Sequence, residues 1–221
     1  MLLRSIARLG VLLVLGIALS GCATSNRRDP LEPLNRGIYQ FNDAFDKALA
    51  KPVAQAYDAV VPDALQMMVR NFFSNLDDVV VTFNNVLQLK LGQALQDGAR
   101  VLVNSTVGIL GVADVASAIG LDKHEEDFGQ TLGRWGIGNG PYLVLPFLGP
   151  SSLRDGFGRL VDVKVDPIFR IDHIPTRNQT LTVKFETKRA DLLDAEKVVD
   201  EAAIDRYSFI RDAYLQRRRS L

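Results

Sequence analysis

Residues 34–49, LNRGIYQFNDAFDKAL, set the pattern from which an all-α fold is predicted. Apolar side chains recur there at intervals of three and four residues, at Ile38, Phe41, Phe45, Ala48 and Leu49. This spacing places them on one face of an amphipathic helix. Because proline lacks an N–H and breaks a helix interior, we expect this helix to lie between Pro33 and Pro52.

The same periodicity continues along the rest of the chain. Pro62 is placed to open a helix, Asp77–Asp78 resembles the start of another, and residues 93–103 continue the pattern. Residues 181–202 suit one long helix or two in series, and residues 204–219 form a last helix with a basic end. Strand-like alternation is confined to residues 180–185, which also suit a helix. The sequence predicts a single all-α domain.

Composition narrows the class of protein. Lysine plus arginine and aspartate plus glutamate both number 26 in 221 residues, so the net charge is zero. No basic stripe with interleaved aromatic residues is present, and we therefore expect no nucleic-acid partner. A chain of this length is one ordinary domain that buries about 70% of its unfolded surface.

The first residues have the parts of an export signal. Arg4 and Arg8 precede an uncharged apolar run at 9–19, which is too short to span a bilayer. Small residues then lead to Cys22, whose thiol is available for acylation. We expect residues 1–21 to be a signal peptide, 22–29 a lipidated tether, 30–216 the folded domain and 217–221 a basic tail.

Cys22 is the only cysteine in the chain, so it has no disulfide partner. The alternative is an ordinary signal peptide, or a short anchor helix, that happens to contain a cysteine. Two or three acyl chains would hold the protein on a membrane, since each buried methylene contributes about 0.8 kcal/mol. Ala23 follows the cysteine where aspartate would retain a lipoprotein in the inner membrane, so we predict the outer membrane.

The middle of the chain has long uncharged stretches. Residues 101–113 carry no charge, and the apolar residues 142–148 are flanked by Gly–Pro pairs. One interpretation is a core helix followed by a tight apolar loop. The other is a pair of short helices in an interfacial hairpin, in which Gly108, Gly111 and Gly120 would allow turning and close backbone approach.

Signals for catalysis are missing. His124 lacks the second histidine of a zinc-binding helix, so we interpret residues 124–127 as a charged turn or helix start. The glycine-rich block at 129–140 matches neither a phosphate loop nor a dinucleotide fingerprint, and instead suits a chain that passes close to another backbone or a ligand. No lipase elbow is present. We predict that the protein is not an enzyme.

Several blocks resemble the VacJ/MlaA lipoprotein family. They are DPLEPLNR at 29–36 leading to Phe41–Asn42, KPVAQAY at 51–57, NFFSNL at 71–76, EDFGQTLGRWGIGNGPY at 126–142, LPFLGPSSLRD at 145–155 and TKRADLLD at 187–194. They occur in order across nearly all of the mature chain. The longest is the most distinctive, and it contributes the glycine-block motif Asp127, Phe128, Gly129, Gly133, Gly136, Gly138, Gly140 and Pro141.

The resemblance implies a ring of amphipathic helices in the periplasmic leaflet of the outer membrane, with a polar central channel for phospholipid. Such proteins associate with trimeric porins and pass phospholipid inward to a periplasmic lipid-binding carrier, which maintains lipid asymmetry and needs no cofactor. The candidate channel or gating residues on this basis are Phe41, Asn42, Gly108, Ile109, Gly111, Asp114 and Gly120.

Alternatives remain at individual residues and for the whole protein. Phe41 could simply pack in a core, and Arg154 with Asp155 suits an ion pair or a helix cap better than a headgroup site. The protein could also be a lipid-anchored assembly factor that binds a porin without moving lipid. A membrane-tethered hydrolase is the third class, for which the sequence offers no nucleophile.

Overall fold

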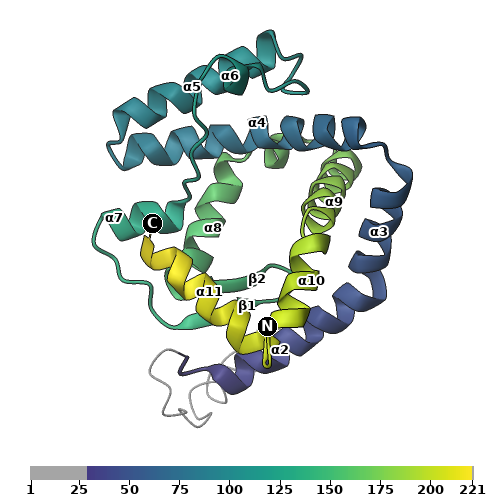
Figure 1. Cartoon of the computed structure of the whole chain (residues 1–221). Coiled ribbons are helices and arrows are strands. Elements are labelled where there is room, and N and C mark those ends of the chain that lie inside the picture. Colours follow the sequence, from purple (N-terminus) through teal and green to yellow (C-terminus); the bar gives the residue numbers. More distant parts are fainter. Residues whose placement is uncertain (1–28, 221) are drawn as a thin grey trace, which may run out of the picture.

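The computed structural model describes residues 29–220, and its helices follow one another around a ring (Figure 1). The predicted signal peptide, Cys22 and the tether before Asp29 lie outside the described residues. In chain order the elements are α2 (Glu32–Phe45), η1 (Asp46–Ala50), α3 (Lys51–Val60), α4 (Asp63–Leu87), α5 (Leu91–Thr106), α6 (Val115–Ala118), α7 (Phe128–Arg134), β1 (Tyr142–Leu145), β2 (Gly149–Ser152), α8 (Leu153–Val165), η2 (Pro167–Arg170), α9 (Ile174–Ala190), α10 (Leu193–Ala202) and α11 (Arg206–Ser220). The prediction of an all-α ring is confirmed.

The first helical segment does not stop before Pro52, so that prediction is wrong. Residues 46–50 form a π-helical turn, and α3 starts at Lys51 with Pro52 in its first turn. Proline is tolerated there because the first N–H groups of a helix have no intrahelical partner. The wider π turn thus carries the chain from α2 into α3 without a break in helical backbone.

Helix α4 is a single helix of 25 residues that begins after Pro62, as predicted. The helix start expected at Asp77–Asp78 is wrong, because both residues lie inside α4. Asp77 accepts hydrogen bonds from Lys184 at 2.6 Å and Lys188 at 3.0 Å, both on α9. These two distant lysines compensate the carboxylate of Asp77, which the sequence had suggested to be the start of a helix.

Residues 142–152 form a β-hairpin where a tight apolar loop was the simpler expectation. Strands β1 and β2 pair antiparallel, with Tyr142 opposite Ser152 and Leu145 opposite Gly149. Phe147 in the turn and Gly149 at the start of β2 have positive φ, at 62° and 75°. The first strand, YLVL, is apolar throughout, and the second, GPSS, consists of residues typical of turns, so neither shows the apolar–polar alternation that would reveal a strand.

The C-terminal segments are helical, as expected. The interval 181–202 is divided between α9 and α10, which confirms two helices in series, and the ambiguous residues 180–185 belong to α9. Residues 217–220, which the sequence sets apart as a basic tail, continue α11. Arg218 is held there by Asp127 at 2.5 Å and Asp155 at 3.0 Å.

Many polar side chains are buried and many apolar ones are exposed, which is the reverse of the distribution in a soluble helical bundle. The largest fully buried side chain is Arg100, and buried asparagines and aspartates are numerous, whereas the apolar core cluster consists of Tyr142, Val144 and Tyr207. Large apolar side chains are exposed along α2, α3, α4, α5 and α8. No helix among residues 29–220 combines the length and the hydropathy needed to cross a membrane.

Polar contacts close the ring where its ends meet. Asn35 on α2 donates to the carbonyl of Tyr142 at 3.0 Å and accepts from the N–H of Val144 at 2.9 Å, which joins α2 to β1. On the other side, Glu196 of α10 binds Lys51, Arg189 and Arg206. This carboxylate therefore connects α3, α9, α10 and α11.

Ring closure at Glu196 should depend on pH. Burial would raise the pKa of Glu196, but hydrogen bonds from Arg206, Arg189 and Lys51 prevail and lower it from 4.5 to about 2. Its contribution to stability is therefore present above the unfolded pKa and is lost as the pH falls through the folded one. Between about pH 6 and pH 3 the free energy of unfolding should decrease in the natural chain and in Glu196→Gln. We expect the decrease to be about 2 kcal/mol larger in the natural chain.

Urea unfolding at each pH measures this difference. Glu196→Gln should be less stable than the natural chain at neutral pH, because three cations lose their common partner, and its stability should be flatter in acid. Identical acid slopes for the two chains would show that Glu196 does not carry this pH dependence.

Candidate functional site

A cavity of about 640 Å³ lies among α4, the segment before α7, α8, α9 and α11. These elements face one another across the ring in Figure 1. The charged and imidazole side chains that line it are Asp77, Lys123, His124, Glu125, Glu126, Asp127, Arg159, Asp162, Asp166, Lys188, Arg217 and Arg218. Charges of both signs therefore face the inside of the ring, and we call this space the central cavity.

The β-hairpin separates the central cavity from an apolar groove. Leu148 and Pro150 line the central cavity, whereas Pro146 and Phe147 line a groove of about 520 Å³ against α2. The α2 side of the groove consists of Pro33, Leu34, Gly37, Ile38 and Phe41. One short turn thus has a cavity lined by many charged side chains on one side and an apolar groove on the other.

Phe41 and Asn42 hold the tip of this hairpin. The amide of Asn42 donates to the carbonyl of Leu145 at 2.9 Å and accepts from the N–H of Phe147 at 2.8 Å. The ring of Phe41 contacts that of Phe147 edge to face, with centroids 5.3 Å apart. The alternative prediction that Phe41 packs in a core is wrong, because 51% of its surface is exposed. Neither residue lines the central cavity.

The first half of the glycine block packs α7 against α8. Asp127 caps α7 by accepting from the N–H of Gln130 at 2.8 Å, and the N–H of Phe128 donates to Asp162. A Cβ on Gly158 of α8 would lie 2.5 Å from the backbone nitrogen of Gly129. The close backbone approach expected of these glycines is therefore present here.

The second half of the block leads the chain from α7 into the hairpin. Gly136 and Gly140 have φ values of 90° and 67°, which favour glycine, and Gly138 stands in open space. A Cβ on Gly140 would approach Leu153 at 3.1 Å. The carbonyl of Pro141 accepts from the N–H of Leu153 at 3.1 Å.

Arg154 and Asp155 form the pair that the sequence suggested, at 3.0 Å. Burial would raise the pKa of Asp155, but Tyr214, Arg218 and Arg154 outweigh this and lower it. Asp155 therefore remains an anion, and it joins the start of α8 to the last turns of α11. Gly133 lies directly under Arg154, since a Cβ there would be 2.6 Å from Nη1.

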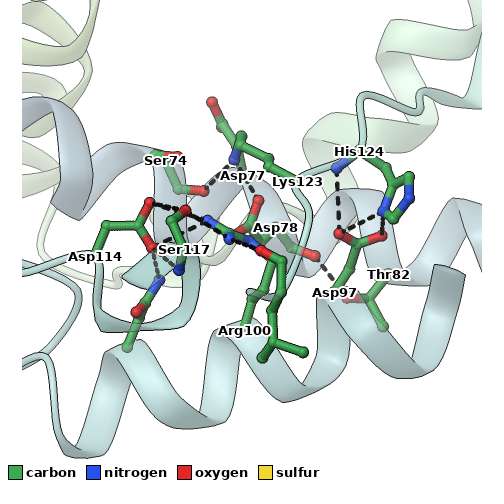
Figure 2. A network of polar contacts seen from close by, with 12 residues as sticks. Ser74, Asp77, Asp78, Thr82, Asp97, Arg100, Asp114, Ser117, Lys123 and His124 are labelled. Carbon is green, nitrogen blue, oxygen red and sulfur yellow. Dashed lines mark hydrogen bonds and ion pairs between the residues drawn. The ribbon is translucent and has the colours of Figure 1, made fainter. Parts of the chain in front are cut away.

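Helices α4 and α5 pack through polar side chains rather than apolar ones. Figure 2 shows Arg100 of α5 between Asp78 of α4 and Asp114 before α6. The guanidinium is 3.2 Å from each carboxylate, and its side chain is 1% exposed. Lys123 also binds Asp78. Because the polar face of α5 points at α4, its leucines are left on the outside.

His124 belongs to the same network (Figure 2). Its Nδ1 lies 3.1 Å from the buried carboxylate of Asp97 on α5. No group of metal-binding side chains is present within residues 29–220. The segment 124–127 ends at the cap of α7, which confirms that it is a charged turn and helix start.

The segment 101–121, in which Asp114 is the only charged residue, forms the end of α5, a turn and α6. Gly108 and Gly111 are close to other backbone or side-chain atoms, and Gly111 and Gly120 have positive φ. Ile109 and Leu110 also have positive φ, and both side chains are exposed. Asp114 caps α6. The lining of the central cavity comes from other elements, and this turn lies on the far side of α4 (Figure 1).

Comparison with protein-family models matches residues 27–221 to the MlaA lipoprotein family. The chain belongs to this family. The Intermembrane phospholipid transport system lipoprotein MlaA of Shigella flexneri is 36% identical over 213 residues, covering 95% of this chain and 84% of the relative. The protein of the same name from Haemophilus influenzae is 30% identical over 216 residues, covering 92% and 86%.

A solved structure shares the fold of this MlaA-family chain. It is described as "Structural basis for maintenance of bacterial outer membrane lipid asymmetry" and matches with a TM-score of 0.75 at 32% identity. The match covers 86% of this chain and 97% of that one. The resemblance inferred from the sequence blocks is thereby confirmed.

The cavity lining of this MlaA-family chain was mostly missed by sequence reasoning. Among the predicted site residues that the structure describes, only Asp127 lines the central cavity. Arg159, Asp162 and Arg218 line it as well, but each is an ordinary charged residue on an amphipathic helix. What these three residues share is a position on the helix face opposite the exposed apolar side chains. That position points to a cavity lining only once the helices are known to form a ring.

Proposed function

We propose that this chain is an outer-membrane lipoprotein that takes phospholipid from the outer leaflet and passes it through the central cavity to a periplasmic carrier. The observation that carries this proposal is the reversed distribution of side chains. Charged residues line the inside of the ring, and apolar residues cover the outside of α2, α3, α4, α5 and α8.

Physical chemistry connects this arrangement to lipid movement. Amphipathic helices lie in a membrane interface with their apolar faces buried about 5–10 Å deep. A charged headgroup crosses hydrocarbon at a large cost unless polar groups compensate it. A ring seated in one leaflet would contact acyl chains outside and offer charged partners inside. A phospholipid could then enter with its headgroup in the central cavity and its chains directed outward.

The β-hairpin is placed to control such entry. Its turn borders the apolar groove through Phe147 and the central cavity through Leu148. Asn42 holds this turn by two hydrogen bonds, which gives Phe41–Asn42 a role in gating. We assign to Gly108, Ile109, Gly111, Asp114 and Gly120 a different role, which is to shape an apolar tip that contacts lipid.

Anchoring and partners complete the proposal. Acylation at Cys22 would deliver the domain to the periplasmic side of the outer membrane, where the helices embed in the inner leaflet. A trimeric porin would support the ring, and a soluble lipid-binding protein would receive the phospholipid. No step requires covalent chemistry or a cofactor.

A transfer assay tests this function. Purified protein with porin, in vesicles that contain labelled phospholipid, should load label onto a soluble periplasmic carrier. Val163→Trp narrows the central cavity and should reduce the loading. Val198→Trp adds the same side chain on the outside of α10 and should leave it unchanged.

The same assay separates the alternatives. If the carrier gains no label while porin binding is intact, the protein is an assembly or interaction factor and the transport proposal fails. Release of fatty acid or lysolipid from the vesicles would instead indicate a hydrolase.

A further inference from the structure

A second cavity, of about 320 Å³, opens beside the central cavity. It is lined by Gln88, Lys90, Gln130, Gly133, Arg134, Arg154 and Arg218. Gln130 and Arg218 also line the central cavity, so the two spaces adjoin. Of the residues that the structure describes, four with cationic side chains and none with a carboxylate line the second cavity, which we call the cationic pocket.

The charge balance of the cationic pocket is positive. Three carboxylates behind it pair with its cations: Glu126 with Lys90, Asp155 with Arg154, and Asp127 and Asp155 with Arg218. Four cations against three carboxylates leave one positive charge. Within residues 29–220 no carboxylate lies in ion-pair range of Arg134, whose side chain is exposed at the end of α7.

The pocket also has free donors in a preset geometry. The guanidinium of Arg154 is held by Asp155 through Nε and reaches the carbonyl of Ile137 through Nη1 at 3.3 Å. Gly133 makes room for it, because a side chain there would displace Nη1. Arginine forks with remaining N–H groups suit planar or tetrahedral oxyanions such as phosphate.

We propose that the cationic pocket binds the phosphodiester group of a phospholipid as it passes the central cavity. A phosphodiester carries one negative charge, which matches the single positive charge left over in the pocket. The volume lies in the range of roughly 300–1,000 Å³ that is usual for small-ligand sites. This inference rests on the proposed function, because it assigns a headgroup position on the same path.

Binding of a soluble short-chain lipid tests the pocket directly. Dihexanoylphosphatidylglycerol is titrated into the full lipoprotein in a phosphate-free detergent, and its ³¹P signal is followed. Arg134→Gln should weaken binding about tenfold or more, because a charged hydrogen bond is lost. Arg170→Gln removes an exposed arginine outside the pocket, from η2, and should leave binding unchanged.

Two matched glycine-to-alanine substitutions supply a second test, which leaves every charged side chain in place. Gly133→Ala should push Arg154 out of place and weaken binding to a similar degree, while circular dichroism and thermal unfolding stay native-like. Gly92→Ala adds the same methyl group to a glycine of α5 with nothing within 4 Å, and should have no effect. Inorganic phosphate should bind more weakly than the lipid, since the site faces a lipid path.

The outcomes separate this inference from the proposed function. Equal lipid affinity of Arg134→Gln and the natural chain would overturn the pocket assignment, even if the natural chain still loads lipid onto a carrier. Inorganic phosphate binding as tightly as the lipid, with the same sensitivity to Arg134→Gln, would indicate a free-phosphate site and overturn the headgroup assignment. Failure of the natural chain to load the carrier would contradict the proposed function instead.

Discussion

Replacing Arg100 by leucine is expected to lower the free energy of unfolding by about 3–5 kcal/mol, because it takes from the buried carboxylate of Asp78 the buried one of its two cations and leaves Asp78 with the half-buried Lys123 alone. Asp78 is fully buried, and Arg100 is 3.2 Å from it with a side chain only 1% exposed. Arg100 also donates to Ser117 and to the carbonyl of Leu121. Its loss therefore removes the contacts that hold α6 and the following segment on α5.

Arg70→Leu is the matched control for this effect. Arg70 also binds an aspartate, Asp191, at 3.0 Å, but both side chains are more than a third exposed. Exposed pairs contribute roughly 0–1 kcal/mol. Urea denaturation of both variants measures the contrast, and similar losses for Arg70→Leu and Arg100→Leu would contradict the view that buried ion pairs hold α4 and α5 together.

Introducing aspartate at both Leu95 and Leu102 is expected to weaken vesicle binding about 100-fold or more, with little change in stability. The two leucines lie seven residues apart on one face of α5 and are 76% and 68% exposed. Burial of each in lipid is worth about 1.5–3 kcal/mol, and 1.4 kcal/mol is a factor of ten. Charge at these positions adds a further cost.

Vesicle flotation of a Cys22→Ala chain without the signal peptide gives the measurement, because no acyl anchor then masks the helices. The paired control is Val198→Asp with Ile204→Asp. Those two apolar residues are also exposed, but they stand among charged residues of α10 and the segment after it. If the two double variants lose vesicle binding to the same extent, the outer face of α5 is not a preferred membrane-binding surface.

The helices could be predicted from sequence because each apolar face repeats locally. The errors arose where the deciding partner is distant. Asp77 looked like a helix start because Lys184 and Lys188, which compensate it, lie more than a hundred residues away. Pro52 looked like a helix end because a π turn before it leaves no short-range pattern.

The family blocks located the glycine-rich segment but not the groups that line the cavities. Lys90, Arg134, Arg154 and Arg218 come from four parts of the chain, and only the ring brings them to one pocket. The periodicity that placed apolar residues on one helix face was informative, but it did not say that this face points outward. In a soluble bundle the same pattern would face a core.

Site-specific photo-crosslinking tests most directly whether headgroups occupy the inside of the ring. A diazirine amino acid at position 163 replaces a valine of the central cavity, and one at position 95 replaces a leucine on the outer face of α5. In vesicles with porin, position 163 should capture phospholipid labelled in its headgroup, and position 95 should capture label carried on acyl chains. Capture of lipid at position 95 with none at position 163 would contradict passage through the central cavity.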